Sequence, residues 1–504
     1  MASDRAASGA ALRDIEACLA GASFQLIQRL ANEWQGRRRF VEGASAAEQL
    51  LAVAGDWADP ARGLAAVDAA IRLGALELAR ALLHRLRAQG AQLQSAQIGQ
   101  LCASELELSL IFGEREAALA LAERHRERLR ASPAGVSLLT LLGEPVSPWL
   151  PDGRPNLLAL SRRIAAGEVD AEQLASLLGP SRRLWLRSPE LPLLFWSALW
   201  RREPERALAF LNGFLQRQGA SPLGLLRKDP ERNVLEQLGN QPPKRVATGP
   251  LVSVVVAAHN AGKTLAYAVD SLLDQTHQRL EVLIGDDASD DDTLQVMEKY
   301  AGEPRVRRFR SLDNQGAYNL RNALAARARG ELLTFHDADD LALSTRIERQ
   351  VACLERTRAV ACATGLLRVR PDGAVVFFKN QKATRLSRVS LMLSPATFAE
   401  VGPFRSARFG ADEELYARIA RRFGSAAIGR IAAPLMLSLW AGASATQQQG
   451  RESLEDGYRS PLRRAYTESV FQRYFAAAPL DDDDVDRRLQ ETGNYAKAAH
   501  VSEI

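Results

Sequence analysis

The stretch from Thr334 to Asp340 carries the most evident chemistry in this sequence. Asp337, Asp339 and Asp340 lie within four positions of one another. Carboxylates this close repel one another unless a cation joins them, and hard oxygen ligands suit Mg²⁺ or Mn²⁺, which keep waters and bridge to substrate phosphates. The alternative is an acidic loop in which Asp340 caps the following helix. These residues alone leave both interpretations open.

Three buried strands are expected to position this stretch and two other polar clusters. They are the apolar runs 251–258, 280–285 and 332–335, rich in branched residues. Each run ends in polar side chains, which are His259 and Asn260, then Asp286 and Asp287, then Asp337 and Asp339. In an open parallel sheet the carboxyl ends of such strands meet at one edge, where ligands bind. The coincidence favours a metal and nucleotide site over a helix cap.

The elements between these strands predict a doubly wound α/β sheet. Helical patterns at 263–273, 293–300 and 321–329 separate the strands, and a further strand is expected at 306–309. The chain has no G-x-G-x-x-G and no phosphate-loop lysine motif. Nicotinamide dinucleotides and ATPase chemistry are therefore disfavoured.

Residues 1–240 read as helices and predict a separate domain. The segments that follow Gly74 and Gly113 resemble each other and lie about 40 residues apart, which suggests tetratricopeptide-like helical repeats or a bundle. The stretch 241–250, rich in proline, glycine and polar residues, predicts a linker. The α/β domain then covers 251–445, and 446–504 is expected to be a C-terminal helical extension.

Composition excludes several classes of protein. The chain has 504 residues, of which 46% are hydrophobic and 25% charged, and a net charge of +5 without a basic block that would argue nucleic-acid binding. Its four cysteines lack C-x-x-C spacing, as expected of reduced thiols. No apolar run reaches the length of a membrane span. We expect a cytoplasmic protein, and peripheral contact with the inner face of the membrane or with a partner protein through the helical domain stays open.

Several short motifs now gain meaning from their order. They are Val252 to Asn260, Ser271 to Thr276, Asp286 to Thr293, Asn314-Gln315-Gly316, Arg321-Asn322, and Asp337-Ala338-Asp339-Asp340. In this succession they resemble the signatures of family 2 glycosyltransferases over residues 250 to 445. The resemblance implies the GT-A fold, a mixed and mainly parallel α/β sheet, and transfer with inversion.

The resemblance also implies roles for single residues. Donor-binding roles fall on His259, Asn260, Asp286, Asp287, Arg321, Asn322 and Asp337. Asp287 would accept from the nucleobase, Asp339 would bind Mn²⁺ or Mg²⁺ between the donor phosphates, and Asp337 would support the metal or the ribose. His259 stands where the family often has a tyrosine against the base, and it stays open whether the imidazole stacks there or merely ends the strand.

The catalytic base is expected at the start of a helix near residue 411. The family's usual Glu-Asp pair is replaced here by Ala411-Asp412. The resemblance therefore implies Asp412 as the base, with Glu413 as the second choice. Simple placement of acids at a helix N-terminus remains the alternative.

Together these features predict a metal-dependent inverting glycosyltransferase. It would move a sugar from a nucleotide-sugar, which we expect to be a UDP-sugar, to a hydroxyl of a glycan or glycolipid acceptor in polysaccharide or lipopolysaccharide assembly. One alternative is a nucleotidyltransferase, although no glycine-rich, basic loop follows the first strand. The other is a degenerate transferase domain that serves as a binding or scaffold module for the helical domain.

Overall fold

A computed structural model describes residues 60–88, 93–179, 188–229, 231–241, 245–441, 461, 463–467, 470 and 501–504. The chain divides into two compact units. The first comprises Met1–Gly153, Gly424–Ala426 and Thr446–Tyr495, and the second comprises Arg154–Phe423, Ala427–Ala445 and Ala496–Ile504. The linker expected at 241–250 therefore lies inside the second unit, and the division falls at Gly153 instead. Residues 442–450 and 471–500, and Cys18, lie outside the described residues.

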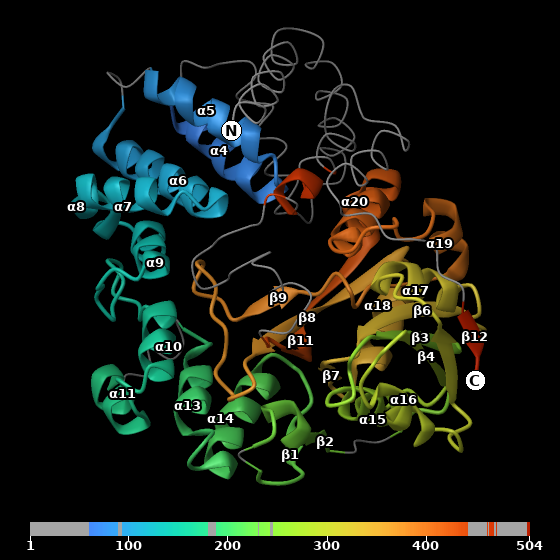
Figure 1. The fold of residues 1–504 in the computed structure, drawn as a ribbon. Coiled ribbons are helices and arrows are strands. Elements are labelled where there is room, and N and C mark those ends of the chain that lie inside the picture. The colour runs from blue at the N-terminus through green and yellow to red at the C-terminus, as the bar shows by residue number, and fades with distance from the viewer. Residues whose placement is uncertain are drawn as a thin grey trace, which may run out of the picture. The chain divides into compact units, whose positions relative to one another are not determined.

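The first unit is helical, as expected. Its helices are α4 (Pro60–Leu73), α5 (Leu76–Ala88), α6 (Ser95–Phe112), α7 (Arg115–Arg124), α8 (Arg126–Arg130) and α9 (Pro133–Leu142) (Figure 1). Gly74 and Gly113 each join two helices with a positive φ, 81° and 76°. Only glycine adopts this backbone without strain, which explains why the two segments look alike in sequence. The type of repeat stays a prediction.

The C-terminal part of the chain contributes to both units. In the first unit, Arg464 and Arg80 both lie over the ring of Phe112, 4.2 and 3.6 Å from its centroid. In the second unit, β12 (Val501–Glu503) pairs antiparallel with β5 (Val306–Ser311) at the edge of the sheet. The stretch 446–504 is therefore not a purely helical extension.

The second unit holds the sheet and the helices that precede it. Those helices are α10 (Leu157–Ala165), α11 (Ala171–Leu178), α13 (Leu191–Leu199) and α14 (Pro204–Arg217), followed by β1 (Leu223–Leu225), η3 (Val234–Gln237) and β2 (Leu238–Asn240). The remaining strands are β3 (Val252–Ala258), β4 (Leu280–Asp287), β6 (Leu332–Asp337), β7 (Asp340–Ala342), β8 (Ala361–Val369), β9 (Thr384–Leu386), β10 (Met392–Leu393) and β11 (Ile428–Leu439). The remaining helices are α15 (Leu265–Leu273), α16 (Thr293–Glu298), α17 (Ala317–Ala325), α18 (Arg346–Thr357), α19 (Pro395–Val401) and α20 (Ala411–Phe423).

The sheet confirms the predicted fold class. Its strand order is β12-β5-β4-β3-β6-β10-β8-β11-β7, with β9 paired to β8, and its long ladders are parallel while the short ones are antiparallel. Helices α15 and α16 cover one side of β3 and β4, and α17 covers the other (Figure 1). The alternating valines of β3 are fully buried because both faces are covered.

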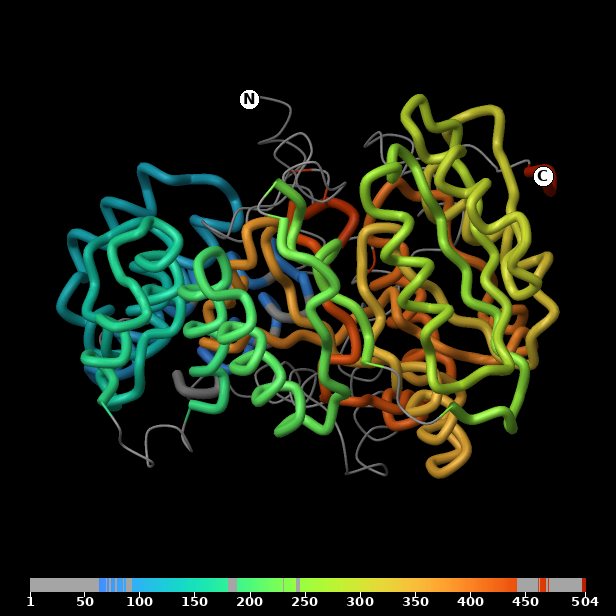
Figure 2. Tube along the Cα trace, turned by 90° about the horizontal axis from the view of Figure 1, so that it is seen from below, coloured from blue at the N-terminus to red at the C-terminus, as the bar shows by residue number. Residues whose placement is uncertain are grey.

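The sequence also predicts a hairpin in which 361–369 and 375–378 flank the turn Pro371-Asp372-Gly373, and the structure forms this hairpin only next to the turn. Residues 375–378 form no strand and contribute one isolated bridge, between Val375 and Val369. Instead, Ser197 accepts from the backbone of Val375 at 3.0 Å, and the indole of Trp196 donates to the carbonyl of Gly373 at 2.7 Å. Figure 2 shows this orange loop running beside the green helices. Close to the turn the pairing is kept, because Arg370 donates to the carbonyl of Ala374 at 2.8 Å and Val376 donates to the carbonyl of Arg368 at 3.0 Å.

This packing predicts that the α/β sheet needs residues 154–240. Trp196 is fully buried and among the largest fully buried side chains of the described protein. Loss of such a side chain alone costs about 3–5 kcal/mol, a large part of the stability of an ordinary domain. We expect a chain that begins at Thr248 to lose cooperative thermal unfolding, whereas a chain that begins at Arg154 keeps it. Equal, cooperative melting of both chains in calorimetry would restore the boundary at 241–250.

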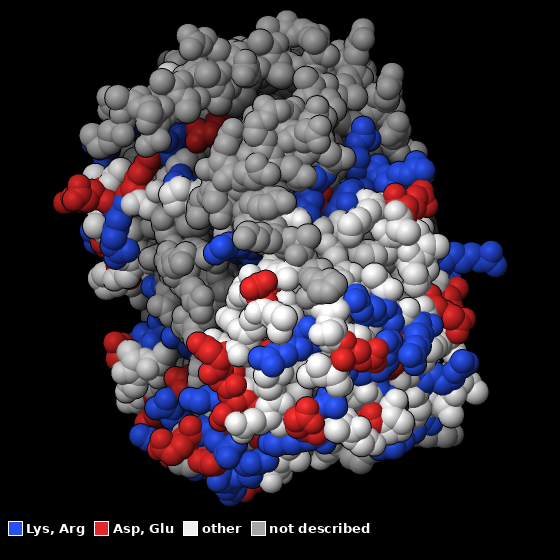
Figure 3. Space-filling view, turned by 45° about the vertical axis from the view of Figure 1, so that its right-hand side comes forward, with Lys and Arg blue, Asp and Glu red and all other residues white. Residues whose placement is uncertain are grey.

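The described surface carries mixed charge. On the face in Figure 3, basic and acidic side chains are interspersed over the described residues. This pattern matches the small net charge of the chain. Among the described helices none is both long and apolar enough to cross a membrane. Cys102, Cys353 and Cys362 are buried free thiols, as expected of core residues.

Candidate active site

Three strand ends bring the predicted polar clusters to one edge. Strand β3 lies between β4 and β6, with Ala258 in register with Asp286 and Ala257 in register with Asp337. Since the chain runs outward from β3 to β4 and β5 and returns on the other side as β6, this edge is a topological switch point. The sequence-based placement of the three clusters is confirmed.

Asp287 is held by the loop that opens α17. Its two carboxylate oxygens accept from the backbone N–H groups of Gln315 and Gly316, each at 2.8 Å. Burial raises the pKa of Asp287 above its ordinary value, against the effect of these two bonds. Asp286 is fully buried and accepts from the backbone of Ser289 at 3.3 Å, so it orders the turn after β4.

His259 lies exposed beside Asp287 and is bound at both ring nitrogens. Its Nδ1 contacts the carbonyl oxygen of Asp287 at 2.9 Å, and its Nε2 contacts the side-chain amide of Asn314 at 3.1 Å. Because a carbonyl only accepts, Nδ1 carries the proton, and the neutral Nε2 accepts from the amide. These two contacts therefore hold the imidazole in one orientation at the carboxyl end of β3.

The loop after β3 is tied to the loop after β4. Asn260 has a positive φ of 51°, its backbone donates to Ser289 Oγ at 2.9 Å, and its side chain accepts from the backbone of Asp290 at 3.0 Å. Gly262 donates to Asp291 at 2.9 Å. These bonds hold a sparsely populated backbone conformation in place. Asn260 thus shapes the site through the backbone.

Asp337 ends β6 and forms an ion pair with Arg321 of α17. Arg321 is buried, whereas the side chain of Asp337 is 34% exposed. Burial disfavours the charge of Arg321, but the carboxylates of Asp337, Asp412 and Asp339 and the hydroxyl of Tyr318 together raise its pKa. The guanidinium of Arg321 therefore interacts both with the acids predicted to bind the metal, Asp337 and Asp339, and with the acid predicted to be the base, Asp412.

Asp339 follows Asp337 in the turn between β6 and β7, and its carbonyl accepts from the hydroxyl of Tyr267 at 2.8 Å. Burial and the charge of Asp337 raise the pKa of Asp339 to about 7. A divalent cation would offset both effects, so these two carboxylates fit an Mg²⁺ or Mn²⁺ ion. Among the described residues no three or more acidic, His or Cys side chains form a metal cluster. Waters and donor phosphates would complete the coordination, as is usual for these ions.

Asp340 does not cap a helix. It opens β7 and is buried, and the residue before α18 is Thr345. Ser438 of β11 lies in register between Asp340 and Arg368 of β8. Burial and the negative charges of Asp339 and Asp337 raise the pKa of Asp340 well above its ordinary value, while Arg368 opposes them. A second arginine therefore lies near the metal motif.

Residues upstream of the strand region support this motif. Asn240 donates to the carbonyl of Ala342 at 3.0 Å and accepts from the backbone of Ser344 at 2.9 Å. Burial and the charges of Asp339, Asp340 and Glu236 raise the pKa of Tyr267. Glu236 lies in η3, which leads directly into β2 and Asn240.

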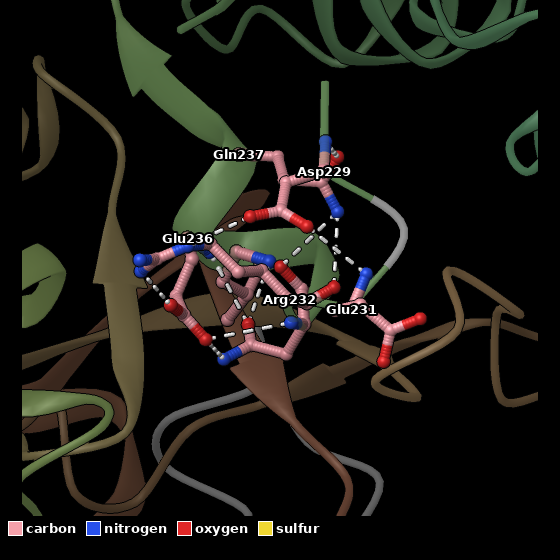
Figure 4. Close-up of polar contacts among 7 residues, drawn as sticks. Asp229, Glu231, Arg232, Glu236 and Gln237 are labelled. Carbon is pink, nitrogen blue, oxygen red and sulfur yellow. Dashed lines mark hydrogen bonds and ion pairs between the residues drawn. The ribbon is translucent and has the colours of Figure 1, made fainter. Parts of the chain in front are cut away.

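Figure 4 shows the hydrogen bonds and ion pairs around η3. The guanidinium of Arg232 bonds Asp229 at 3.0 Å and Glu236 at 2.8 Å. The side chain of Asn233 accepts from the backbone N–H groups of Leu235 and Glu236 and so caps η3.

The buried guanidinium of Arg346 bonds the strand that leads into the metal motif. Arg346 is fully buried and donates to the carbonyl of Phe335 at 2.7 Å and to Thr334 Oγ1 at 3.1 Å. It also contacts Nδ1 of His336 at 2.9 Å, while Nε2 of that ring contacts the carbonyl of Asp340 at 3.1 Å. Burial lowers the pKa of Arg346 to about 10. This network fixes the backbone on both sides of Asp337 and Asp339.

Asp412 lies in the first turn of α20 and is half-buried. Its Oδ1 accepts from the hydroxyl of Tyr318 at 2.5 Å. Glu413 points elsewhere: its exposed carboxylate pairs with Arg388 at 3.1 Å. The geometry therefore favours Asp412 over Glu413 as the acid that faces Arg321 and the donor edge.

Asn322 contacts the protein chain itself. Its amide donates to the carbonyl of Phe404 at 2.7 Å and accepts from the N–H of Phe404 at 2.9 Å. It thereby ties α17 to the segment that leads into α20. The donor contact that the resemblance implies for Asn322 stays a prediction.

Sequence reasoning did not single out four residues of the site: Tyr318, Arg346, Arg368 and Asn240. For Arg346 a weak signal was available, because this arginine opens a helix close in sequence to the acidic cluster. The contacts of the other three join residues far apart in the chain, and no local pattern marks them.

Known proteins are similar to part of this chain. Residues 253–416 match the family model described as Glycosyl transferase family 2. The putative glycosyltransferase EpsE of Bacillus subtilis (strain 168) is 34% identical over 123 residues, which cover 24% of this chain and 44% of EpsE. The Escherichia coli protein WfaP, a UDP-Glc:alpha-D-GlcNAc-diphosphoundecaprenol beta-1,3-glucosyltransferase, is 34% identical over 105 residues, which cover 21% of this chain and 41% of WfaP.

The matched part spans less than half the length of these two relatives. A crystal structure of S. aureus TarS 1–349 in complex with UDP-GlcNAc has a TM-score of 0.36 and 18% identity, and covers 48% of this chain and 71% of that chain. The family match includes all three strand ends and the start of α20. Residues 253–416 are therefore a family 2 glycosyltransferase domain.

Proposed function

We propose that the protein transfers a sugar from a nucleotide-sugar, specifically a UDP-sugar, to a hydroxyl of a glycan or glycolipid, with inversion and with the help of a divalent cation. One observation carries the proposal. The buried Arg321 pairs with Asp337 of the metal motif and lies 5.2 Å from the ring of Tyr318, whose hydroxyl bonds Asp412, so one arginine connects the acids expected to serve the donor phosphates and the acceptor hydroxyl.

The donor side is expected to extend along the edge from His259 to Asp337. The fixed imidazole of His259 offers a flat ring for a nucleobase, and Asp287 keeps the adjoining loops in place. Each carboxylate oxygen of Asp287 has a second lone pair, which leaves it able to accept from a base N–H.

The reaction needs one proton transfer and one displacement. The acceptor oxygen forms a bond to the anomeric carbon while the bond from that carbon to the diphosphate oxygen breaks, and nucleoside diphosphate leaves. Asp412 takes the proton of the acceptor hydroxyl. Attack opposite the leaving group inverts the anomeric configuration.

Asp339, supported by Asp337, would hold a Mn²⁺ or Mg²⁺ ion, which supplies charge neutralisation at the leaving diphosphate. The nearby arginines Arg321 and Arg368 add positive charge to the same region. Their positions favour departure of an anionic leaving group.

The names of the relatives support the acceptor class. WfaP is named for a diphosphoundecaprenol-linked sugar acceptor, and TuaG of Bacillus subtilis (strain 168) is a putative teichuronic acid biosynthesis glycosyltransferase. We therefore propose a polysaccharide or a lipid-linked glycan as the acceptor. We also propose that the enzyme is cytoplasmic and contacts the surface of the membrane in which such an acceptor is anchored.

A donor panel tests the proposal. The full chain is incubated with UDP-, GDP- and other nucleotide-sugars and Mn²⁺, and release of nucleoside diphosphate is measured with and without glycan acceptors. We expect UDP to be released from a UDP-sugar, and we expect EDTA to abolish this release. No release from any donor would favour a scaffold role, whereas release of pyrophosphate from a nucleoside triphosphate and a sugar phosphate would favour a nucleotidyltransferase.

A further inference from the structure

The carboxylate of Asp412 accepts a hydrogen bond from a tyrosine on a neighbouring helix. Among them, Tyr318 is the one hydrogen-bond partner of this side chain, and it bonds Oδ1 at 2.5 Å. The two residues lie on different helices, α17 and α20. Tyr318 is 7% exposed, so its hydroxyl points into the protein towards Asp412 and away from bulk water.

The direction of the bond is fixed by a second contact. The backbone N–H of Gly410 donates to the hydroxyl oxygen of Tyr318 at 3.1 Å. That oxygen therefore accepts from Gly410, and its own hydrogen is directed to Asp412. Burial and the charge of Asp412 raise the pKa of Tyr318 well above its ordinary value, so the hydroxyl keeps its proton. Tyr318 is a donor to Asp412 and cannot replace it as a base.

The ring of Tyr318 is held from two sides. The guanidinium of Arg321 lies 5.2 Å from its centroid, and the ring of Phe404 lies 5.4 Å away at a tilt of 40°. Asn322 in turn holds the backbone of Phe404. The hydroxyl is therefore presented by a packed group that can hold a carboxylate within the narrow tolerance that catalysis needs.

We propose that Tyr318 is a positioning residue for the catalytic base: its hydroxyl holds Oδ1 of Asp412 so that Oδ2 takes the proton of the acceptor hydroxyl. This inference rests on the proposed function. It assigns to α17 a part in the acceptor half of the reaction in addition to its ion pair with Asp337.

The test compares two tyrosines that differ in their aspartate partner. Tyr318→Phe removes the bond to Asp412. Tyr300→Phe is the matched control, because Tyr300 is 8% exposed and donates to Asp270 at 2.8 Å, on α15. We expect Tyr318→Phe to lower kcat about tenfold to a hundredfold, the weight of a hydrogen bond to a charged group. The KM for the UDP-sugar should stay within about twofold, and Tyr300→Phe should leave both unchanged.

A double variant separates this inference from the proposed function. In an Asp412→Asn background, Tyr318→Phe should lower kcat little further, because both changes disable one unit. Full turnover of Asp412→Asn alone would overturn the proposed base. Slow turnover of Asp412→Asn together with unchanged kcat in Tyr318→Phe, or an equal loss in the Tyr300→Phe control, would overturn the role of Tyr318 alone.

Discussion

Replacement of Asp339 by alanine is expected to abolish the Mn²⁺-dependent part of UDP binding. The remaining carboxylate, Asp337, is engaged by Arg321, so it cannot hold a divalent ion against the diphosphate by itself. Titration calorimetry of the full chain with UDP should show a large gain in affinity on addition of Mn²⁺ for the unmodified protein. For Asp339→Ala the affinities with and without Mn²⁺ should coincide.

The control for this prediction is Asp274→Ala, an exposed carboxylate at the end of α15. It should bind UDP as the unmodified protein does. Asp339→Ala should not melt at a lower temperature in the absence of metal, because burial beside Asp337 already disfavours this carboxylate in the folded chain. Metal-dependent affinity that survives in Asp339→Ala would remove Asp339 from the donor site.

The α/β sheet was predictable because its signals are local. Continuous runs of branched apolar residues, as in Val254 to Val256, mark strands covered on both faces, and polar residues mark their ends. The observed β3, β4 and β6 lie within two residues of the expected strands at either end. From these alone it follows that His259, Asp287 and Asp337 share one edge.

The boundary at 241–250 was not predictable in the same way. Prolines and glycines report where the backbone turns, and they say nothing about which side chains pack together. The indole of Trp196 bonds Gly373, and Asn240 bonds Ala342, across separations that no periodic pattern registers. The composition changes at this stretch, but residues before it still bond to residues after it.

Contacts across helices were equally hidden. Tyr318 and Asp412 are 94 positions apart, and Arg346 bonds β6, from which β7 separates its own helix. Each follows from packing that is set only when the sheet is complete. The family resemblance pointed to Asp412 but not to the hydroxyl that holds it.

Replacement of Asp412 by asparagine is expected to lower turnover by roughly 10² to 10⁴, the usual weight of a positioned general base. The amide has the shape of the carboxylate, and its oxygen can still accept from Tyr318, so the fold of α20 should persist. UDP and Mn²⁺ should bind almost unchanged, because the diphosphate is expected at Asp339. The measurements are kcat with a working donor and acceptor, and calorimetry with UDP.

Glu413→Gln provides the matched comparison one residue further along the helix. Consecutive helical side chains point about 100° apart, and Glu413 pairs with Arg388 while its side chain is 60% exposed. An exposed pair of this kind contributes at most about 1 kcal/mol, so turnover should change less than about fivefold. If Glu413→Gln is the inactive variant, the base lies one residue later. If Asp412→Asn loses UDP affinity as strongly as turnover, Asp412 is a donor ligand, and the acceptor hydroxyl must give its proton to another group.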